Sequence, residues 1–569
     1  MHDVYTQKPW LNHYDPNVPS ALSYEDKTFA EVFQDVVRRS PDKTALIYLG
    51  SHLNFRELDE LSNQLAHFFI QSGLKPNDVV GLHLPNIPAH YIAVIAAQKA
   101  GCVTSGLSPL MTPAEMAHQL QDSQAKMVIT VDVLFAKLAQ VATECPFATI
   151  LVSEIADFLP PLKRFLGKLL KKIPTAEVTP IPGKNIRRFT EILPTFSKEF
   201  VPVKRTMDDM IFMMYTGGTT GLAKGAMLTQ RNYMYNRRQV LTWLDIKTED
   251  TALSAFPMFH IAGLALGGFI ITQGATQVCV PNPRDSHFLI EAIKKYRPTC
   301  IVNVPTVYFE MMKKPEFKTV DLSGVKWCLS AAAPFPAENI KELEAIIGEG
   351  NFIELYGMTE TSPVTCCNPR YGKKKASSIG MPLSDTEFKL IDPASREPVK
   401  PGEPGEIAIR GPQVMKGYFG QPGETANVLR DGWLYTGDIA RMDDDGYFYI
   451  VDRLKDMVIV SGFKVFTREL DDVLSRHPDV QMAASVGLPD PERPGSERVA
   501  CAITLRPGIE DSAAEKEIIL KYLKENVAPY KVPKVITFMD QLPTSGVGKI
   551  LKRELKQILA EQPSHNGRA

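Results

Sequence analysis

The chain has 569 residues, more than one hydrophobic core usually serves, so we expect more than one domain. Apolar residues make up 44% and charged residues 23%, as in an ordinary globular protein. A formal net charge of -1 gives no concentrated basic surface, so a nucleic-acid partner is not expected. The eight cysteines form no CxxC pair and no zinc-ligand spacing with histidine, which is typical of reduced thiols in a reducing compartment.

The amino terminus has no basic segment followed by an apolar run, as a secretory signal would have. No uncharged apolar stretch reaches the roughly 18 residues of a membrane span. These features predict a cytoplasmic protein.

The first half of the chain alternates between helical and strand patterns. Residues 56–73 place apolar side chains at helical spacing and end at a glycine, 79–84 predicts a short strand, and 88–101 predicts another helix. The alternation recurs over 126–150 and 286–304. This order predicts α/β layers with largely parallel sheets.

The pattern changes after about residue 455. Before that point, glycine and proline predict tight turns between strands at 398–405 and 443–446. After it, the sequence predicts a compact mixed unit, with strands at 458–460, 481–487 and 499–505 and helices at 468–476 and 513–526.

The predicted fold is α/β, with two domains of unequal size. Residues 1–453 would form a large body of several subdomains with mostly parallel sheets. Residues 454–560 would form a small, mobile α+β carboxy-terminal domain, and 561–569 a frayed tail.

A stretch rich in glycine and threonine, residues 215–225, follows an apolar run at 210–214 that predicts a strand. Backbone amides and threonine hydroxyls can surround phosphate oxygens there, and a lysine adds positive charge. It is not a Walker loop, because the lysine precedes a glycine rather than serine or threonine. A flexible turn is the common fate of a short glycine-rich stretch, but this density of groups favours phosphate binding. The candidate residues are Thr216, Gly217, Gly218, Thr219, Thr220, Gly221 and Lys224.

This stretch resembles the phosphate loop of the adenylate-forming superfamily, which includes acyl-CoA synthetases, luciferases and the adenylation domains of peptide synthetases. Most members have proline before the lysine, where this chain has Ala223, a departure that removes no phosphate-binding group. The resemblance runs over roughly residues 25–555 and is strongest to long-chain fatty-acyl-CoA synthetases. It implies ATP and Mg²⁺ as cofactors, with a fatty acid and coenzyme A as the other substrates.

A second motif begins at Tyr356 and resembles the family segment that stacks on adenine. The resemblance implies that Tyr356 and Gly357 line the adenine site and that Thr359 contacts the α-phosphate. Glu360 would help to hold Mg²⁺, for which a carboxylate oxygen is a suitable ligand. Ala332 lies in a stretch of small residues similar to the one that lines the adenine and acyl pockets.

The sequence from 431 to 455 looks like the signature of fatty-acyl-CoA synthetases. The resemblance implies that Asp438 accepts hydrogen bonds from the ribose hydroxyls and that Arg453 supports it. Taken singly, these residues could be a turn aspartate and a surface charge. The length of the match favours the binding site.

The resemblance places a hinge just before Lys455, about which the small domain would rotate between two steps. In the first pose Lys549 would stabilise charge on the attacking carboxylate and the α-phosphate. In the second, Ser461, Gly462 and Lys464 would help to form the tunnel for pantetheine. Taken alone, a loop lysine is more often simply exposed.

His260 lies in a segment that resembles the acyl-pocket motif, near the acyl carboxylate or the path of the thiol. The alternative is a core histidine. Residues 251–280 contain no Asp or Glu, so a substrate ammonium would have no partner, and a plain carboxylic acid is expected. Gly263 and Leu264 follow the histidine motif, without the tryptophan gate of some long-chain members. Leu264, Leu266, Phe269, Ile270 and residues 302–312 offer apolar walls, although core packing explains them equally well.

Two other function classes stay open: an aryl-CoA or other carboxylic acid–CoA ligase, or an acyl transferase to a carrier protein, and a catalytically silent binding protein. The intact set of charged motif residues argues against the silent protein.

Residues 158–174 predict a basic amphipathic helix. Its apolar face could lie in a bilayer interface, which would make the protein peripheral to the inner face of a membrane. Packing of that face on its own domain is the slightly favoured alternative. The sequence leaves this membrane contact, and a homodimer, open. The apolar positions are Leu162, Phe165, Leu166, Leu169, Leu170 and Ile173.

Overall fold

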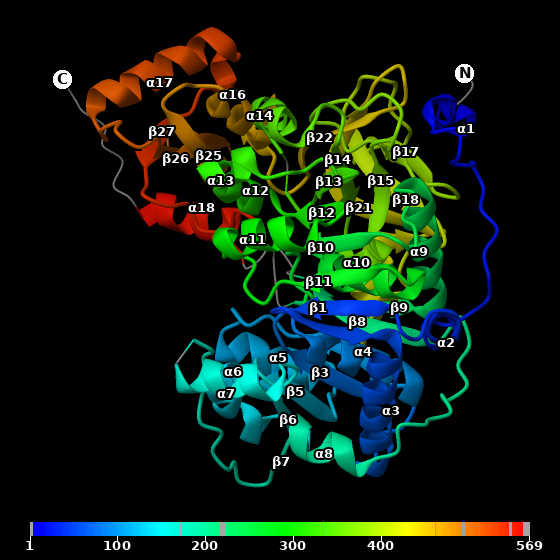
Figure 1. Ribbon diagram of the computed structural model, residues 1–569. Coiled ribbons are helices and arrows are strands. Elements are labelled where there is room, and N and C mark those ends of the chain that lie inside the picture. The colour runs from blue at the N-terminus through cyan, green and yellow to red at the C-terminus, as the bar shows by residue number, and fades with distance from the viewer. Residues whose placement is uncertain are drawn as a thin grey trace.

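The computed structural model describes residues 4–170, 172–216, 223–333, 335–460, 463–491, 493, 496–545 and 549–561 (Figure 1). Two mostly parallel sheets and an antiparallel sheet form the large body, and a smaller domain follows at the carboxyl end of the chain. This is the predicted α/β class, with an antiparallel third sheet that the sequence analysis did not anticipate.

One mostly parallel sheet has the strand order β19-β9-β8-β4-β3-β5-β6-β7. Its strands from β8 to β7 are parallel, and β9 and β19 join antiparallel at one edge. The bounds are β3 (Val79–His83), β4 (Val103–Gly106), β5 (Met127–Val131), β6 (Thr149–Ser153), β7 (Asn185–Arg188), β8 (Met210–Thr216), β9 (Lys224–Thr229) and β19 (Gly417–Tyr418).

The other mostly parallel sheet has the order β16-β15-β14-β13-β12-β10-β11-β1-β2. Its edge strands β2, β15 and β16 are antiparallel. The bounds are β1 (Thr44–Tyr48), β2 (Ser51–Asn54), β10 (Thr251–Ser254), β11 (Thr276–Cys279), β12 (Cys300–Asn303), β13 (Trp327–Ser330), β14 (Phe352–Gly357), β15 (Val364–Cys367) and β16 (Met381–Pro382).

The antiparallel sheet brings β21 between β18 and β22. The turns predicted at 398–405 and 443–446 connect β17 to β18 and β21 to β22. The bounds are β17 (Glu387–Ile391), β18 (Gly405–Arg410), β20 (Leu429–Arg430), β21 (Trp433–Met442) and β22 (Phe448–Arg453).

Helices cover the sheets, and several begin where the sequence supplies a capping box. Thr28 with Glu31 starts α2, and Asn54 with Glu57 starts α3, each side chain accepting from the other's backbone N–H. The helices of the body are α1 (Val4–Gln7), α2 (Phe29–Arg39), α3 (Phe55–Gln71), α4 (Pro88–Ala100), α5 (Pro113–Asp122), α6 (Asp132–Ala139), α7 (Pro161–Leu169), α8 (Phe189–Ile192), α9 (Gln230–Trp243), α10 (Ile261–Gln273), α11 (Ser286–Tyr296), α12 (Pro305–Met312), α13 (Pro315–Thr319), α14 (Ala337–Ile347) and α15 (Pro422–Val428).

The carboxy-terminal domain has its own core. Two buried apolar clusters draw their members from Val458 to Leu559, and the clusters of the body end at Phe448. The elements are β23 (Val458–Val460), β24 (Phe463–Val465), α16 (Thr467–Ser475), β25 (Val480–Pro489), β26 (Glu497–Leu505), α17 (Ala513–Asn526), β27 (Val535–Phe538) and α18 (Lys552–Glu561). Of these, β24, β27 and α18 were not predicted.

Membrane-spanning helices were sought over the described residues, and no helix there is long and apolar enough to cross a bilayer. All eight cysteines are buried and free. Burial raises the pKa of thiols such as Cys279, so these side chains behave as small apolar groups.

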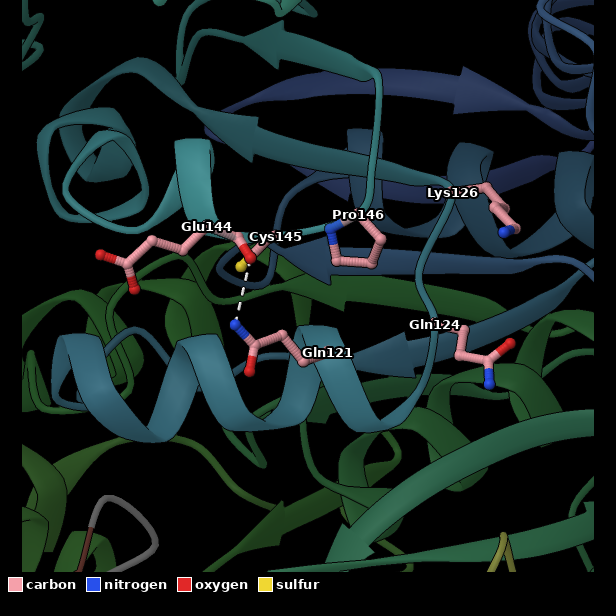
Figure 2. Close-up of a pocket in the computed structure, with 6 residues that line it drawn as sticks. All are labelled: Gln121, Gln124, Lys126, Glu144, Cys145 and Pro146. Carbon is pink, nitrogen blue, oxygen red and sulfur yellow. Dashed lines mark hydrogen bonds between the residues drawn. The ribbon is translucent and has the colours of Figure 1, made fainter.

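A hollow of about 460 Å³ lies at the amino ends of β5 and β6 (Figure 2). Ligand sites in parallel α/β sheets form instead at the carboxyl ends of the strands. None of the predicted site residues lines this hollow, so it is not the candidate active site. Its lining residues are Gln121, Gln124, Lys126, Glu144, Cys145 and Pro146.

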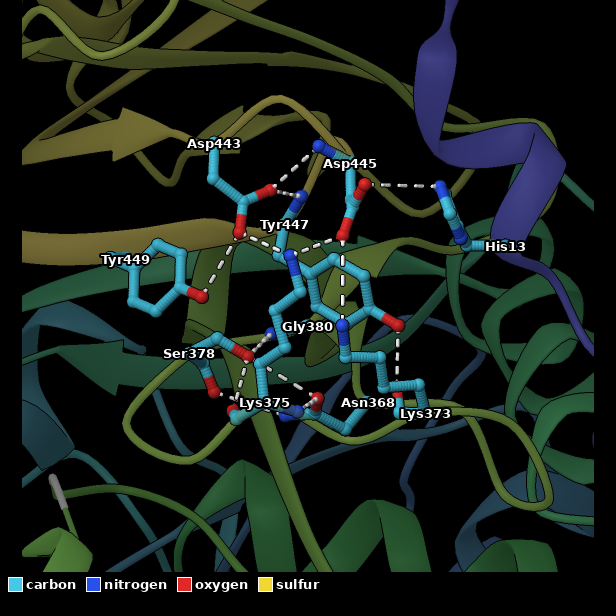
Figure 3. Close-up of polar contacts among 10 residues, drawn as sticks. All are labelled: His13, Asn368, Lys373, Lys375, Ser378, Gly380, Asp443, Asp445, Tyr447 and Tyr449. Carbon is cyan, nitrogen blue, oxygen red and sulfur yellow. Dashed lines mark hydrogen bonds and ion pairs between the residues drawn. The ribbon is translucent and has the colours of Figure 1, made fainter.

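A polar network fastens the amino-terminal segment to the antiparallel sheet (Figure 3). Lys375 Nζ lies 2.6 Å from Asp443 Oδ2 and 2.7 Å from Asp445 Oδ2. His13 approaches Asp445 at 3.7 Å, and Tyr449 Oη donates to Asp443 at 3.1 Å. The turn between β21 and β22 is thereby held against the loop that follows β15.

A buried lysine ties α4 to α3. Lys99 is fully buried, and its Nζ donates to Asp59 Oδ1 at 2.6 Å, Ser62 Oγ at 2.7 Å and Asn63 Oδ1 at 2.6 Å. Burial lowers the pKa of Lys99 to about 8, although the Asp59 charge opposes that shift. The charged form of Lys99 is therefore stabilised in the core by the hydrogen bonds to these three side chains.

We expect Asp59→Ala to destabilise the body by about 3 kcal/mol, because it leaves a buried ammonium without its counter-charge. Urea unfolding followed by tryptophan fluorescence measures this, since all four tryptophans precede residue 454. Asp42→Ala is the control, because both it and its partner Arg56 are exposed and water replaces the lost contact, so this variant should unfold close to the wild-type urea midpoint. Equal shifts in the two variants would contradict the prediction.

Candidate active site

The predicted site residues follow the carboxyl ends of strands in both mostly parallel sheets. Thr216 ends β8, His260 comes after β10, Ala332 after β13, and Gly357 ends β14. Side chains that follow parallel strands in this way gather at one edge of a sheet. The topology therefore accounts for how residues more than a hundred positions apart come to one place.

The phosphate-loop candidates begin and end on paired strands. Thr216 and Lys224 are register partners in the β8–β9 ladder, so the loop closes directly on itself. Lys224 Nζ forms an ion pair with Glu424 of α15 and lies 5.4 Å from the centre of the Tyr418 ring. The lysine is thus held at the mouth of the loop. Gly217, Gly218, Thr219, Thr220 and Gly221 lie outside the described residues.

Glu360 is buried in the short turn that follows β14. Its side chain is 6% exposed, and Tyr418 Oη donates to Oε1 at 2.8 Å. Burial raises the pKa of this carboxyl group, so a cation nearby would favour its charged form. Thr359 beside it is also buried. Tyr418 therefore stands between Glu360 and Lys224.

Two positions at this edge have backbone conformations or surroundings that restrict which residue can occupy them. A Cβ on Gly357 would lie 1.9 Å from the Pro363 carbonyl oxygen, so only glycine fits there. Ala332 adopts a left-handed conformation with φ of +72°, which is uncommon for a residue with a Cβ. Gly357 is the last residue of β14 and Ala332 follows β13, so both constrained positions lie at the carboxyl ends of parallel strands.

Asp438 and Arg453 face each other across β21 and β22, where they are register partners. Arg453 Nε lies 3.1 Å from Asp438 Oδ1, and Tyr356 Oη donates to Asp438 Oδ2 at 2.6 Å. The Asp438 side chain is 9% exposed. Its nearly buried carboxylate is therefore fixed by a cation on one side and a phenol on the other.

Lys549 reaches this group from the carboxy-terminal domain. Its backbone pairs with Ser545 at 2.7 Å in a narrow loop, and Thr544 bridges Ile550. The pKa of Lys549 is lowered to about 8, mainly by burial and also by the positive charge of Arg453, while the Asp438 carboxylate opposes both effects. Burial also lowers the pKa of Lys455, which lies beside the predicted hinge. The small domain thus covers the site with Lys549 directed inward.

His260 caps the amino end of α10. Its Nδ1 accepts a hydrogen bond from the Ala262 N–H at 3.3 Å. Burial lowers its pKa to about 4, and the charge of Lys549 acts in the same direction. The imidazole is neutral at pH 7, and with Nδ1 acting as acceptor the proton is on Nε2.

Lys464 is the one predicted pantetheine residue among the residues that the structure describes. Lys464 lies on β24 with its side chain exposed, and its charge acts on Asp392. Ser461 and Gly462 lie outside the described residues. Lys464 is therefore exposed while Lys549 is buried near Asp438 and Arg453, and the assignment of the two lysines to two poses stays a prediction.

Sequence reasoning missed Tyr418 and Glu424, which contact Glu360 and Lys224 respectively. A cavity of about 280 Å³ beside the hinge also went unpredicted. The only local signal for Tyr418 is its position after Gly417 and shortly before a helix that begins with proline. That signal does not indicate which distant residue Tyr418 contacts. The cavity is lined by Pro393, Arg396, Glu406, Asn427, Val428, Tyr435, Thr436, Gly437 and Leu454.

Lys224 at the end of a glycine-rich loop, and a buried Asp438 paired with Arg453, form a polar site at the strand ends. Comparison with known families identifies the class of protein. The AMP-binding enzyme family matches residues 33–419, and the AMP-binding enzyme C-terminal domain matches residues 469–549. The chain belongs to the AMP-binding enzyme family.

Characterised relatives cover almost the whole chain. A long-chain-fatty-acid–CoA ligase of Bacillus subtilis (strain 168) is 36% identical and covers 97% of this chain and 98% of its own. The ligase of that name from Escherichia coli O157:H7 is 35% identical, with the same coverage. A feruloyl-CoA synthase from Amycolatopsis is 34% identical and covers 91% of this chain and 96% of its own.

Solved structures have the same fold. An ATP-bound MatB from Rhodopseudomonas palustris is 25% identical, with a TM-score of 0.82 over 94% of this chain and 99% of its own. A benzoate CoA ligase from Burkholderia xenovorans LB400 is 24% identical, with a TM-score of 0.80 over 93% of this chain and all of its own.

The charges around Lys549 predict how its titration responds to substitution. Asp438→Asn removes the carboxylate that opposes the shift, so the pKa of Lys549 should fall below its value of about 8. Arg453→Gln removes a repelling cation, so the pKa should rise. Carbon-13 NMR of dimethylated lysines measures both, with Lys549→Arg assigning the signal. If Lys549 titrates identically in the wild type, Asp438→Asn and Arg453→Gln, the charges of Asp438 and Arg453 do not act on it, and the prediction fails.

Proposed function

We propose that this chain is an ATP-dependent, AMP-forming ligase that activates a fatty acid as an acyl-adenylate and then transfers the acyl group to coenzyme A. The observation that carries the proposal is the convergence of Asp438, Arg453 and Lys549, from two domains, beside the strand end that carries Tyr356. The names of the relatives support the same chemistry and the fatty-acid substrate.

The nucleotide would lie between the body's strand ends and the lid. Asp438 would accept both ribose hydroxyls, with Arg453 holding its carboxylate in place. On ATP binding the Tyr356 ring would contact adenine, in the region of Ala332 and Gly357. The loop from Thr216 to Gly221, with Lys224, would surround the phosphates.

Glu360 is the residue that fits a Mg²⁺ ion. It is a buried carboxylate whose raised pKa shows the cost of its charge, and a bound cation would offset that cost. Held by Glu360, the ion would supply positive charge against the negative charge that develops on the leaving pyrophosphate. Tyr418 holds one carboxylate oxygen of Glu360, which leaves the other to face the phosphates together with Thr359.

In the first step a carboxylate oxygen of the acid attacks the α-phosphorus, the bond to the bridging oxygen breaks, and pyrophosphate leaves. Negative charge grows on the phosphoryl oxygens, where Lys224 and Lys549 supply cations. Lys549 must be protonated for this, and its pKa of about 8 leaves most molecules protonated at pH 7.

In the second step the thiol sulfur of coenzyme A attacks the acyl carbonyl, the carbonyl–phosphate bond breaks, and AMP leaves as the thiol proton is released. The exposed position of Lys464 and the separate cores of the two domains support a rotation at Lys455 between the steps. We place the rigid body at 1–453 and the lid at 454–560. Rotation would exchange Lys549 for Ser461, Gly462 and Lys464.

His260 would act as a hydrogen-bond donor and not as a base. Its Nδ1 accepts from the backbone, so the Nε2 proton is the group available to the acyl carboxylate or carbonyl oxygen. Its low pKa keeps it neutral, so it adds no charge that would hold a carboxylate in place.

The substrate would be a plain carboxylic acid, because residues 251–280 carry no acidic side chain to pair with an ammonium. Several apolar residues of α10 and the α12 region pack in the core of the body, so their burial alone does not define an acyl tunnel. An aryl-CoA ligase is the second candidate, favoured by the feruloyl-CoA synthase relative.

Lys549→Ala separates the two steps. We expect ATP–pyrophosphate exchange to fall on the order of 100-fold or more, because one stabilising cation is lost from the first transition state. Thioester formation from a supplied acyl-adenylate should stay within about threefold, since Lys549 is rotated away in that step. Lys524→Ala on exposed α17 is the control. Equal losses in both steps would contradict the division between two poses.

A panel of acids tests the substrate. Coupled AMP release should depend on coenzyme A and give the highest kcat/KM with alkyl acids, as the names of the relatives suggest and as the lack of an acidic partner for a substrate ammonium allows. Ferulate and benzoate are the competing substrates, and an acyl carrier protein is the competing acceptor. The highest kcat/KM with an aryl acid would favour the second candidate, and release of no AMP with any acid would reject both.

A further inference from the structure

Helix α7 turns its apolar side chains away from the protein. Leu162, Phe165 and Leu169 are 70%, 63% and 64% exposed, and Leu166 and Leu170 are exposed beside them. This differs from the expectation that the helix packs its apolar face on its own domain. These four apolar side chains of α7, with Leu170 directly after its end, form the kind of exposed patch that marks an interaction surface. Figure 1 shows α7 at the outer edge of the body.

The opposite face of α7 holds the helix to the body through charge. Arg164 lies about half a turn of the helix away from the apolar stripe. Its guanidinium lies 3.4 Å from Glu154 Oε2 and 3.2 Å from Asp157 Oδ1. Glu154 is itself held by Arg188 at 2.9 Å. The usual amphipathic arrangement, in which charge faces water and apolar side chains face the core, is therefore reversed.

Two lysine ammonium groups meet at the base of the same helix. Lys163 Nζ and Lys295 Nζ lie 3.1 Å and 3.2 Å from the point that a Cβ on Gly50 would occupy. Lys163 belongs to α7 and Lys295 to α11, so separate elements bring these charges together. Lys172, just beyond the helix, is also exposed. Clustered cations beside an apolar face are complementary to anionic lipid head groups.

We propose that the exposed apolar face of α7 (Leu162, Phe165, Leu166 and Leu169), together with the adjoining Leu170, inserts into the interface of an anionic phospholipid membrane. Lys163 and Lys295 contact the head groups, and the Arg164 ion pairs keep the helix oriented with its apolar side outward. This proposal goes beyond the proposed function and does not depend on it, because binding is measured without ATP, acid or coenzyme A.

The first test is co-sedimentation of the full chain with vesicles of phosphatidylglycerol and phosphatidylcholine, and with phosphatidylcholine alone. The triple variant Leu162→Ser, Phe165→Ser, Leu169→Ser should bind the anionic vesicles at least tenfold more weakly. Its control is Leu110→Ser, Val201→Ser, Ile518→Ser, which removes three apolar side chains that are 55%, 89% and 51% exposed elsewhere. An unchanged thermal unfolding midpoint shows that each variant is folded. Equal recovery of wild type and α7 variant overturns the proposal.

The second test separates charge from apolar contact. Lys163→Gln with Lys295→Gln should weaken binding to anionic vesicles severalfold and reduce its salt dependence, because counter-charges are removed. Lys521→Gln with Lys524→Gln on α17 is the matched control. A second copy of the chain is the competing occupant. If wild type forms a dimer that the α7 variant loses, while vesicle recovery is equal for both, the face is a dimer interface and the proposal fails.

Discussion

The carboxylate of Asp438 is the group on which the arrangement of the site depends. It accepts a hydrogen bond from Tyr356, which lies on a strand of a different sheet, and it pairs with Arg453 on the neighbouring strand of its own sheet. Its negative charge also opposes the lowering of the pKa of Lys549 in the carboxy-terminal domain. Without it, the positive charges of Arg453 and Lys549 would act on each other with no carboxylate to offset the repulsion, which is unfavourable. One buried negative charge therefore brings three separate parts of the chain together.

The boundary between the two domains allows the contacts around Asp438 to form in one domain orientation and to break in another. The apolar cores of the two domains share no members, so rotation between them breaks no packed cluster. Asp452, just before the hinge, accepts hydrogen bonds from the backbone N–H and Oγ1 of Thr467 at the start of α16. Lys552 also donates to Thr467, at 2.8 Å. Polar contacts of this kind can hold one pose and be replaced in another, because water can take their place.

The sequence allowed the regular elements of the body to be predicted, because their apolar periodicity is strong and capping residues such as Asn54 mark where they begin. It did not predict β27 or α18, since α18 buries only Leu555 and Leu559 over its length. Motif resemblance predicted Asp438 and Arg453. It could not predict Tyr418, because that residue is 58 positions from its partner Glu360 and only the tertiary fold brings them together.

A crystal structure of the full chain with ATP and Mg²⁺ tests the central claim most directly. The account predicts that the ribose hydroxyls lie within hydrogen-bond distance of the Asp438 carboxylate, the adenine against Tyr356, and the phosphates between Lys224 and Lys549. Nucleotide bound elsewhere, with Asp438 still paired only to Arg453 and Tyr356, would contradict it.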